Sequence, residues 1–128
     1  MYKRQAINPS DSSNYFWGST NGTIFKSLDG GATWSFNSSL PFGSVNKILI
    51  HPTNPAIMFA SAAPGGLYKS TNGGINWNEI SPATIRGYDF EFKPGDPSVI
   101  YASGINFYKS SDGGANFNQI TGLSLIHI

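Results

Sequence analysis

Short runs in which apolar and polar residues alternate recur along the chain, separated by turns rich in Gly, Pro, Ser and Asn. The clearest unit, residues 44–80, predicts strands over 45–51, 57–61, 67–70 and 77–80. The pattern returns over 87–120, and a first copy over 6–37 lacks most of its first strand. No stretch keeps a helical period. The pattern therefore predicts an all-β fold with about three four-stranded antiparallel units.

One octapeptide occurs in each unit, always after an aromatic residue and Lys. Its shared positions are a Ser, an Asp or Asn, a Gly and an aromatic residue. They are filled by Ser27, Asp29, Gly31 and Trp34, by Ser70, Asn72, Gly74 and Trp77, and by Ser110, Asp112, Gly114 and Phe117. We expect the Asp or Asn to accept backbone N–H groups of a tight turn, the Gly to take a positive φ, and the aromatic ring to cover the turn. With at most one acid per copy, the motif predicts a structural clip and no metal site.

These octapeptides resemble the Asp box, also called the bacterial neuraminidase repeat. The resemblance covers nearly all of residues 6–122 and implies blades of a β-propeller, as in sialidases, xyloglucanase-type glycoside hydrolases, sortilin-type receptors and a photosystem assembly factor. The sequence departs from the family pattern at four positions, namely Asn72, Asn76, Asn116 and Phe117. A propeller needs about four blades or more to close. We therefore expect this to be an internal fragment whose apolar faces are covered by missing blades of the same parent chain.

Both ends of the chain look foreign. Residues 1–5 can be encoded by a nucleotide string whose reverse complement encodes Leu-Ser-Leu-Ile-His, the residues at 123–127. The string resembles a sequencing adapter, and coincidence is the alternative. We expect residues 1–5 and 123–128 not to be native, which leaves 6–122 as the partial propeller.

The remaining composition excludes several classes of partner and site. The net charge is +1 with no basic run, which argues against nucleic acid. The absence of Cys excludes disulfides and Cys-ligated metals. No apolar run approaches the roughly 20 residues of a membrane span. His51 is expected in a surface turn, and no cofactor is predicted. The resemblance implies a secreted or cell-surface location, with a carbohydrate or protein ligand.

The innermost predicted strands hold the candidate binding residues, which are Arg86, Tyr88, Asp89 and Glu91. Alternation places Asp89 and Glu91 on one face, with carboxylates roughly 6 to 7 Å apart, a separation found in glycosidase acid and base pairs. This pattern favours either a sugar site or a structural pair, since Lys47 occupies the matching level of the preceding unit and is expected beside Asp89.

Catalytic residues of the resembled families are not found at the matching positions. A sialidase needs three Arg residues, and 6–122 contains only Arg86. A xyloglucanase needs an Asp just after the second strand, where no unit has an acid. The sequence thus favours a non-catalytic scaffold of an exported propeller that binds glycans or proteins. The alternatives are a glycoside hydrolase whose catalytic residues lie outside the fragment and an intracellular assembly factor.

Overall fold

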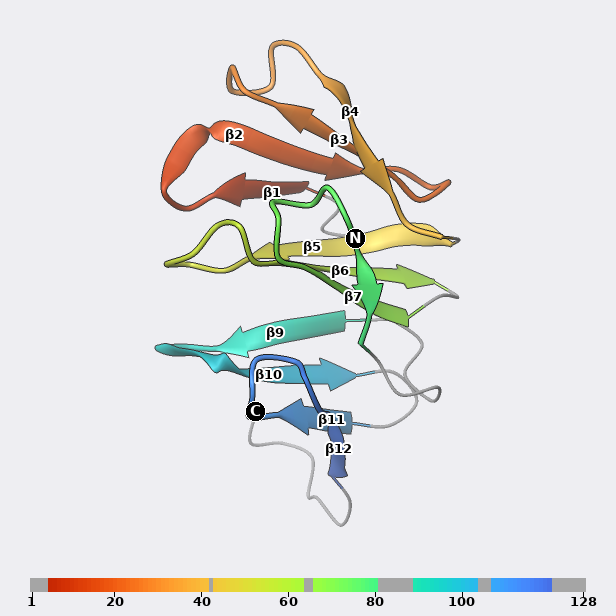
Figure 1. Ribbon diagram of the computed structural model, residues 1–128, viewed down its shortest axis with the longest axis vertical. Helices are drawn as coiled ribbons and strands as arrows, with labels where there is room; N and C mark the ends of the chain where they lie inside the picture. The colour runs from red at the N-terminus through yellow and green to blue at the C-terminus, as the bar shows by residue number, and fades with distance from the viewer. Residues whose placement is uncertain (1–4, 42, 64–65, 81–88, 104–106, 121–128) are drawn as a thin grey trace.

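The computed structural model describes residues 5–41, 43–63, 66–80, 89–103 and 107–120. In these residues the chain forms twelve strands and no helix. The strands make three four-stranded antiparallel sheets, which follow one another along the long axis of the molecule (Figure 1). The predicted all-β fold of three four-stranded blades is confirmed.

Each sheet is an up-and-down meander. The first blade contains β1 (Gln5–Asn8), β2 (Asp11–Gly18), β3 (Thr23–Ser27) and β4 (Ser35–Ser39). The second contains β5 (Ser44–Ile50), β6 (Met58–Ala63), β7 (Gly66–Ser70) and β8 (Asn78–Glu79). The third contains β9 (Asp89–Lys93), β10 (Asp96–Ser103), β11 (Phe107–Ser110) and β12 (Asn118–Ile120).

The first blade differs in extent from the expected unit. Its first strand begins at Gln5, which pairs with Trp17. Its last strand reaches Ser39, two residues past the expected boundary. The reason lies in Ser38 and Leu40, which are both buried. Leu40 joins the core shared with the second blade, and this contact holds the strand in place beyond its own turn.

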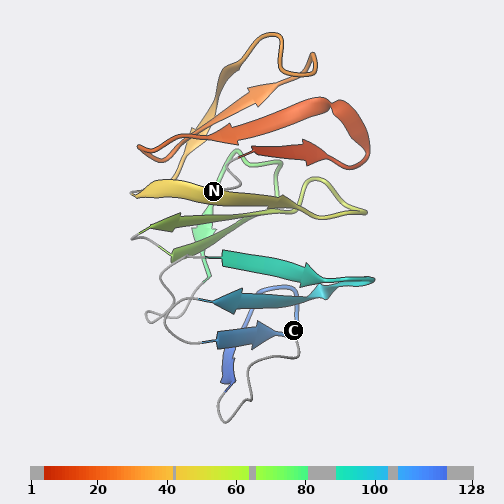
Figure 2. The same ribbon diagram turned by 180° about the vertical axis from the view of Figure 1, so that it is seen from behind.

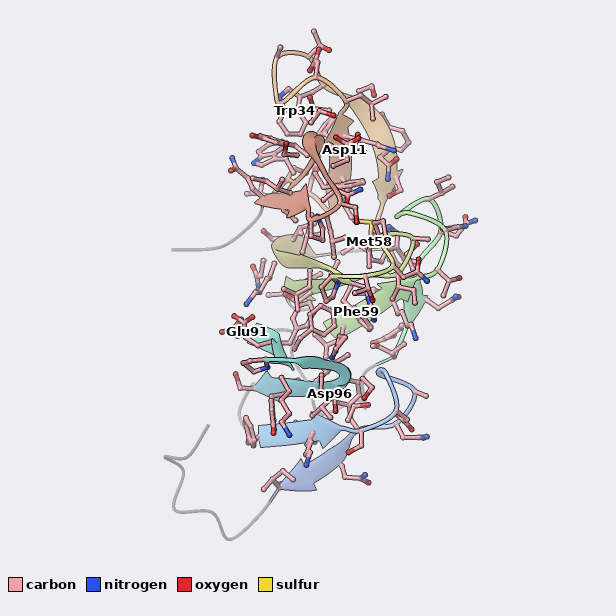
Figure 3. The ribbon with its side chains drawn as sticks, turned by 90° about the vertical axis from the view of Figure 1, so that its left-hand side faces the viewer. Asp11, Trp34, Met58, Phe59, Glu91 and Asp96 are labelled. Carbon is pink, nitrogen blue, oxygen red and sulfur yellow. The ribbon has the colours of Figure 1, made fainter. Side chains whose placement is uncertain are left out.

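Cross-strand register gives every blade two faces with equivalent positions. Phe16 pairs with Lys26, Phe59 with Lys69, and Tyr101 with Lys109. We call the face that carries these residues the forward face, because in the first two blades it is turned to the following blade. The opposite, backward face carries the neighbouring residues on the same strands. Figure 3 shows this alternation on β6, where Met58 points toward the first blade and Phe59 toward the third.

Two hydrophobic clusters join the three blades. Phe16 and Ile24 of the first blade pack with Ile48, Met58 and Tyr68 of the second. Phe59 and Leu67 on the other side of the second blade pack with Phe90, Ile100 and Tyr108 of the third. Full burial of a large apolar side chain contributes about 1.5 to 3 kcal/mol. The core therefore lies between the sheets, as alternation along the strands requires.

The innermost strands approach one another at the joints between blades. The views from the front and from behind both show β5 next to β1 (Figure 2). At this joint Val45 N–H donates to the Ser19 carbonyl at 3.0 Å. A Cβ on Gly18 would lie only 2.3 Å from Val45 Cγ1, so only glycine permits this approach.

Candidate functional site

The innermost strands of the second and third blades bring one cation and two carboxylates together. The Lys47 ammonium on β5 donates to the Asp89 carboxylate on β9 at 3.0 Å and also contacts Glu91. The Lys47 side chain is only 6% exposed, whereas both carboxylates are more than half exposed. An ammonium this deeply buried needs such partners, because leaving it unpaired would be costly.

The local sequence explains how this ion pair forms. Phe90 lies between Asp89 and Glu91 on β9 and is buried against the second blade. The Lys47 ammonium lies 6.0 Å from the centre of the Phe90 ring and reaches past it to the carboxylates. The Phe90 N–H donates to the Asp89 carboxylate at 2.8 Å, which fixes that side chain. The expected pairing of Lys47 with Asp89 is thus observed, and Glu91 joins it.

Asp89 and Glu91 also border a cleft of about 400 Å³ on the forward face of the third blade. Its other lining residues come from β9 to β11 and the turn after β9, and they are Phe90, Phe92, Pro94, Tyr101, Ala102, Ser103 and Phe107. The Tyr101 and Phe107 rings stack with centroids 5.7 Å apart and planes 16° apart. The sequence motifs did not indicate these two rings. Alternation along β10 and β11 could have indicated both rings, because it places Tyr101 and Phe107 on the same face as Glu91.

Two of the predicted binding residues, Arg86 and Tyr88, lie outside the described residues. The structure brings together the other two, Asp89 and Glu91. A sugar site that includes all four residues therefore stays a prediction.

The three octapeptides form closely similar turns. In each, the Ser hydroxyl accepts the N–H of the second Gly, at 2.8 Å for Ser27 and 2.9 Å for Ser70 and Ser110. The same hydroxyl donates to the Asp or Asn side chain two residues later. That side chain accepts the N–H four residues further on, for example Thr33 N–H to Asp29 at 2.8 Å. The Ser and the Asp or Asn side chains of the octapeptide thus accept the backbone N–H groups of their own turn.

The expected glycine conformation is confirmed and extends to a second position. Gly31, Gly74 and Gly114 have φ values of 96°, 84° and 93°. The Gly before each of them also has a positive φ, between 72° and 74°. Both glycines of each pair therefore take a left-handed backbone that other residues adopt at a cost.

The turn hydrogen bonds lower the pKa values of the octapeptide acids. The Thr33 hydroxyl, the Thr33 N–H and the Ser27 hydroxyl lower the pKa of Asp29 to about 2. The backbone and side-chain N–H groups of Asn116, with the Ser110 hydroxyl, lower the pKa of Asp112 to about 2. Hydrogen bonds to a carboxylate favour its ionised form.

Of the three remaining acids, Asp11 and Asp96 bond to residues of their own turns, and Glu79 lies on β8 opposite Tyr68. All seven acids of the chain fall within the described residues. Asp11 accepts the hydroxyl and N–H of Ser13, and Asp96 accepts those of Ser98, which lowers the pKa of each acid. Glu79 pairs in register with Tyr68, whose pKa is raised by burial and then by the Glu79 charge.

Metal ligands do not gather in the described part of the chain, where no group of three or more His, Cys, Asp or Glu residues occurs. His51 lies in a turn, as expected. Its Nδ1 accepts the N–H groups of Thr53 at 3.2 Å and Asn54 at 3.1 Å. Nor does the described chain contain a helix that could cross a membrane.

Two of the octapeptide turns also contact the preceding blade. Asn37 donates to the Gly74 carbonyl at 2.8 Å, and the Ser38 hydroxyl donates to the same oxygen. Trp77 Nε1 lies 3.0 Å from the Ser38 hydroxyl. At the next joint Lys69 donates to the Gly113 carbonyl at 3.1 Å. The octapeptide is thus both a clip within its blade and a contact between blades.

No family model and no curated protein matches the sequence. Several solved structures share the fold. A GH74 enzyme from Niastella koreensis is 25% identical with a TM-score of 0.75, over 94% of this chain and 22% of that one. The GH74 xyloglucanase from Xanthomonas campestris is 16% identical with a TM-score of 0.76, over 95% and 24%. The chain of a YCF48 structure with a bound D1 peptide is 18% identical with a TM-score of 0.68, over 92% and 39%.

These neighbours are β-propeller proteins, which confirms the propeller-type fold. The chain spans about a quarter or less of the length of the GH74 enzymes and 39% of YCF48. It therefore corresponds to a segment of each.

Proposed function

We propose that this chain, which has the fold of a β-propeller segment, is a non-catalytic part of an exported propeller that binds glycan or protein ligands. The observation that carries the proposal is the ion pair between blades. Lys47 forms ion pairs with Asp89 and Glu91, the two carboxylates that the sequence pattern suggested as an acid and base pair. A glycosidase needs one carboxyl to protonate the leaving oxygen and the other to face the sugar or a water. An ammonium bonded to both takes up the space between them.

The other acids support the same function. Asp11, Asp29, Asp96 and Asp112 all accept hydrogen bonds within their own turns. Groups committed in this way are poorly placed to transfer protons to a ligand. Ligand binding in such a scaffold falls to loops and inner strands of the complete ring. One propeller of similar fold, YCF48, was solved with a bound D1 peptide, which supports a protein ligand.

The second candidate is a segment of a glycoside hydrolase whose catalytic residues lie on other blades. The likeness in fold to GH74 enzymes, one of them a xyloglucanase, favours it. This chain is 16% and 25% identical to those enzymes and covers only 22% to 24% of their length. Similarity at this level supports a shared fold but does not indicate a shared catalytic reaction.

The test uses the complete propeller, obtained by sequencing the source gene outward from residues 6 and 122. Release of reducing sugar from xyloglucan and sialylated glycans is measured beside equilibrium binding to glycan and peptide arrays. We expect binding without hydrolysis. If the complete propeller hydrolyses a substrate, the double variant Asp89→Asn with Glu91→Gln tests whether this segment supplies the catalytic carboxylates. Asp96→Asn is the matched control. Loss of about a thousandfold in kcat in the double variant alone, in protein that near-UV circular dichroism shows to be folded, would overturn the non-catalytic assignment of this segment.

A further inference from the structure

The innermost strand of the middle blade, β5, is an edge of its sheet. It pairs with β6 on one side, while β1 of the first blade and β9 of the third lie alongside it. Every second residue of an edge strand directs its N–H and C=O away from the paired strand. Over residues 47–50 the described backbone makes no hydrogen bond outside the ladder with β6. This free edge lies in the middle of the segment, so it does not depend on the blades that would cover the two end faces.

A groove of about 340 Å³ follows this edge between the two neighbouring strands. The wall on the side of the first blade consists of β1 and the turn after it. It begins with Gln5, which we expect not to be native, and continues with Ala6, Ile7 and Pro9. Ile7 is 53% exposed. This wall therefore offers apolar surface to a ligand.

The wall on the side of the third blade is acidic. It consists of Glu91 and Phe92, and Figure 3 shows Glu91 projecting from β9 at the margin of the molecule. A following blade leaves this level accessible, because Leu49 at the same level of β5 is only half-buried although the third blade packs against it. The Lys47 ammonium contacts two carboxylates, so the cluster keeps an excess negative charge.

We propose that this groove binds an extended peptide of a protein partner, which adds to the free edge of β5 and places basic side chains beside Glu91. The inference rests on the ligand-binding function proposed above and narrows it to a protein ligand. Side chains of an added strand alternate between the two faces of the sheet. One set then faces the apolar wall of β1, and the other faces the acidic wall of β9. The groove therefore selects a segment in which apolar and basic residues alternate.

The lining favours a peptide over a glycan. The aromatic residue of the groove is Phe92, and its ring is engaged with His51 and Phe59 in the joint between the blades. The groove thus offers a sugar ring little to stack on. A strand edge, by contrast, supplies backbone N–H and C=O groups in the spacing that a peptide backbone matches.

The test uses the complete propeller and a synthetic peptide of about ten residues, the length of a long strand, in which Val and Lys alternate and both ends are blocked. Calorimetric titration should show saturable binding at one site. The same peptide with Glu in place of Lys should bind at least tenfold more weakly, because its charge repels Glu91. Two further versions are N-methylated at every Val or at every Lys. One of them should lose binding and the other keep it, since alternate N–H groups of an added strand point at β5.

Charge reversal on the protein tests the acidic wall. Glu91→Lys should weaken binding of the Val and Lys peptide at least tenfold and strengthen binding of the Val and Glu peptide, a reversal that an unfolded variant would not show. Glu79→Lys on the outermost strand of the same blade makes the same change in net charge at an exposed position and is the matched control, with no effect expected.

The outcomes separate this inference from the broader function. Array ligands that bind while the Val and Lys peptide does not, or equal binding by both N-methylated versions, would overturn the peptide groove alone. So would a glycan that displaces the peptide and loses affinity in Glu91→Lys, because the groove would then belong to a sugar. Hydrolysis of a glycan with peptide binding intact would overturn the non-catalytic assignment and leave the groove in place.

Discussion

The first and second octapeptide turns have nearly the same backbone but very different surroundings. The first lies at the free end of the molecule, where Trp34 is 41% exposed (Figure 3). Its Asp29 accepts both the N–H and the hydroxyl of Thr33, at 2.8 and 2.5 Å. The second has the uncharged Asn72 in place of the acid, and Asn72 accepts the Asn76 N–H at 2.9 Å.

The second turn gains from the neighbouring blade what its own residues lack. Asn37 and Ser38 both donate to the Gly74 carbonyl, and Trp77 packs against the core between the first two blades. The octapeptide therefore has two sources of stability. The first turn is held mainly by its own acid, whereas the second, which lacks an acid, is also held by the adjacent blade.

Replacing the aromatic residue should separate the two turns most strongly. We expect Trp77→Ala to lower the free energy of unfolding by about 3 kcal/mol, because it removes core packing and the contact with Ser38. Trp34→Ala should cost about 1 kcal/mol, since that ring mainly covers its own turn. Urea titrations at one protein concentration measure both. Equal losses would show that the joint adds nothing to the second turn.

A substitution at the second Gly should give the next largest difference. In Gly31→Ala the positive φ alone costs about 1 to 2 kcal/mol. In Gly74→Ala the added Cβ would also lie 3.1 Å from Asn37 Nδ2 and 3.3 Å from Met58 Sδ. We therefore expect a loss about 1 kcal/mol larger for Gly74→Ala, measured in the same titrations. A smaller loss at Gly74 would mean that the first blade shifts freely away from the turn.

Much of this architecture follows from local patterns that the sequence carries. On β9 alternation correctly places Asp89 and Glu91 on one face, while Phe90 and Phe92 on the other face pack toward the second blade. The spacing of Asx and Gly in the octapeptide correctly predicts that the Asx side chain accepts a backbone N–H and that the second Gly has a positive φ. These properties depend on residues within a few positions of one another, so a sequence pattern reveals them.

Contacts between blades were harder to predict, because they join residues about 40 positions apart. Nothing in the pattern around Lys69 indicates that it donates to Gly113, and Ser38 gives no sign of its contact with Trp77. The pairing of Lys47 with Asp89 was predicted only because the two residues occupy matching levels of neighbouring units. The participation of Glu91 depends on the reach of the Lys47 side chain, which alternation does not specify.

The smallest expected difference between the two turns is their response to acid. Asp29 has a folded pKa of about 2 against an ordinary value of 3.8, so its hydrogen bonds stabilise the fold fully above about pH 4. This contribution is lost as the pH falls from 4 through 2, while Asn72 has no proton to gain. Asp29→Asn should therefore reduce the pH dependence of the urea midpoint over that range. Asn72→Asp should increase it, because the Ser70 hydroxyl and the Asn76 N–H are already aimed at that position. Unchanged pH profiles in both variants would show that the acid of the octapeptide does not contribute through its charge.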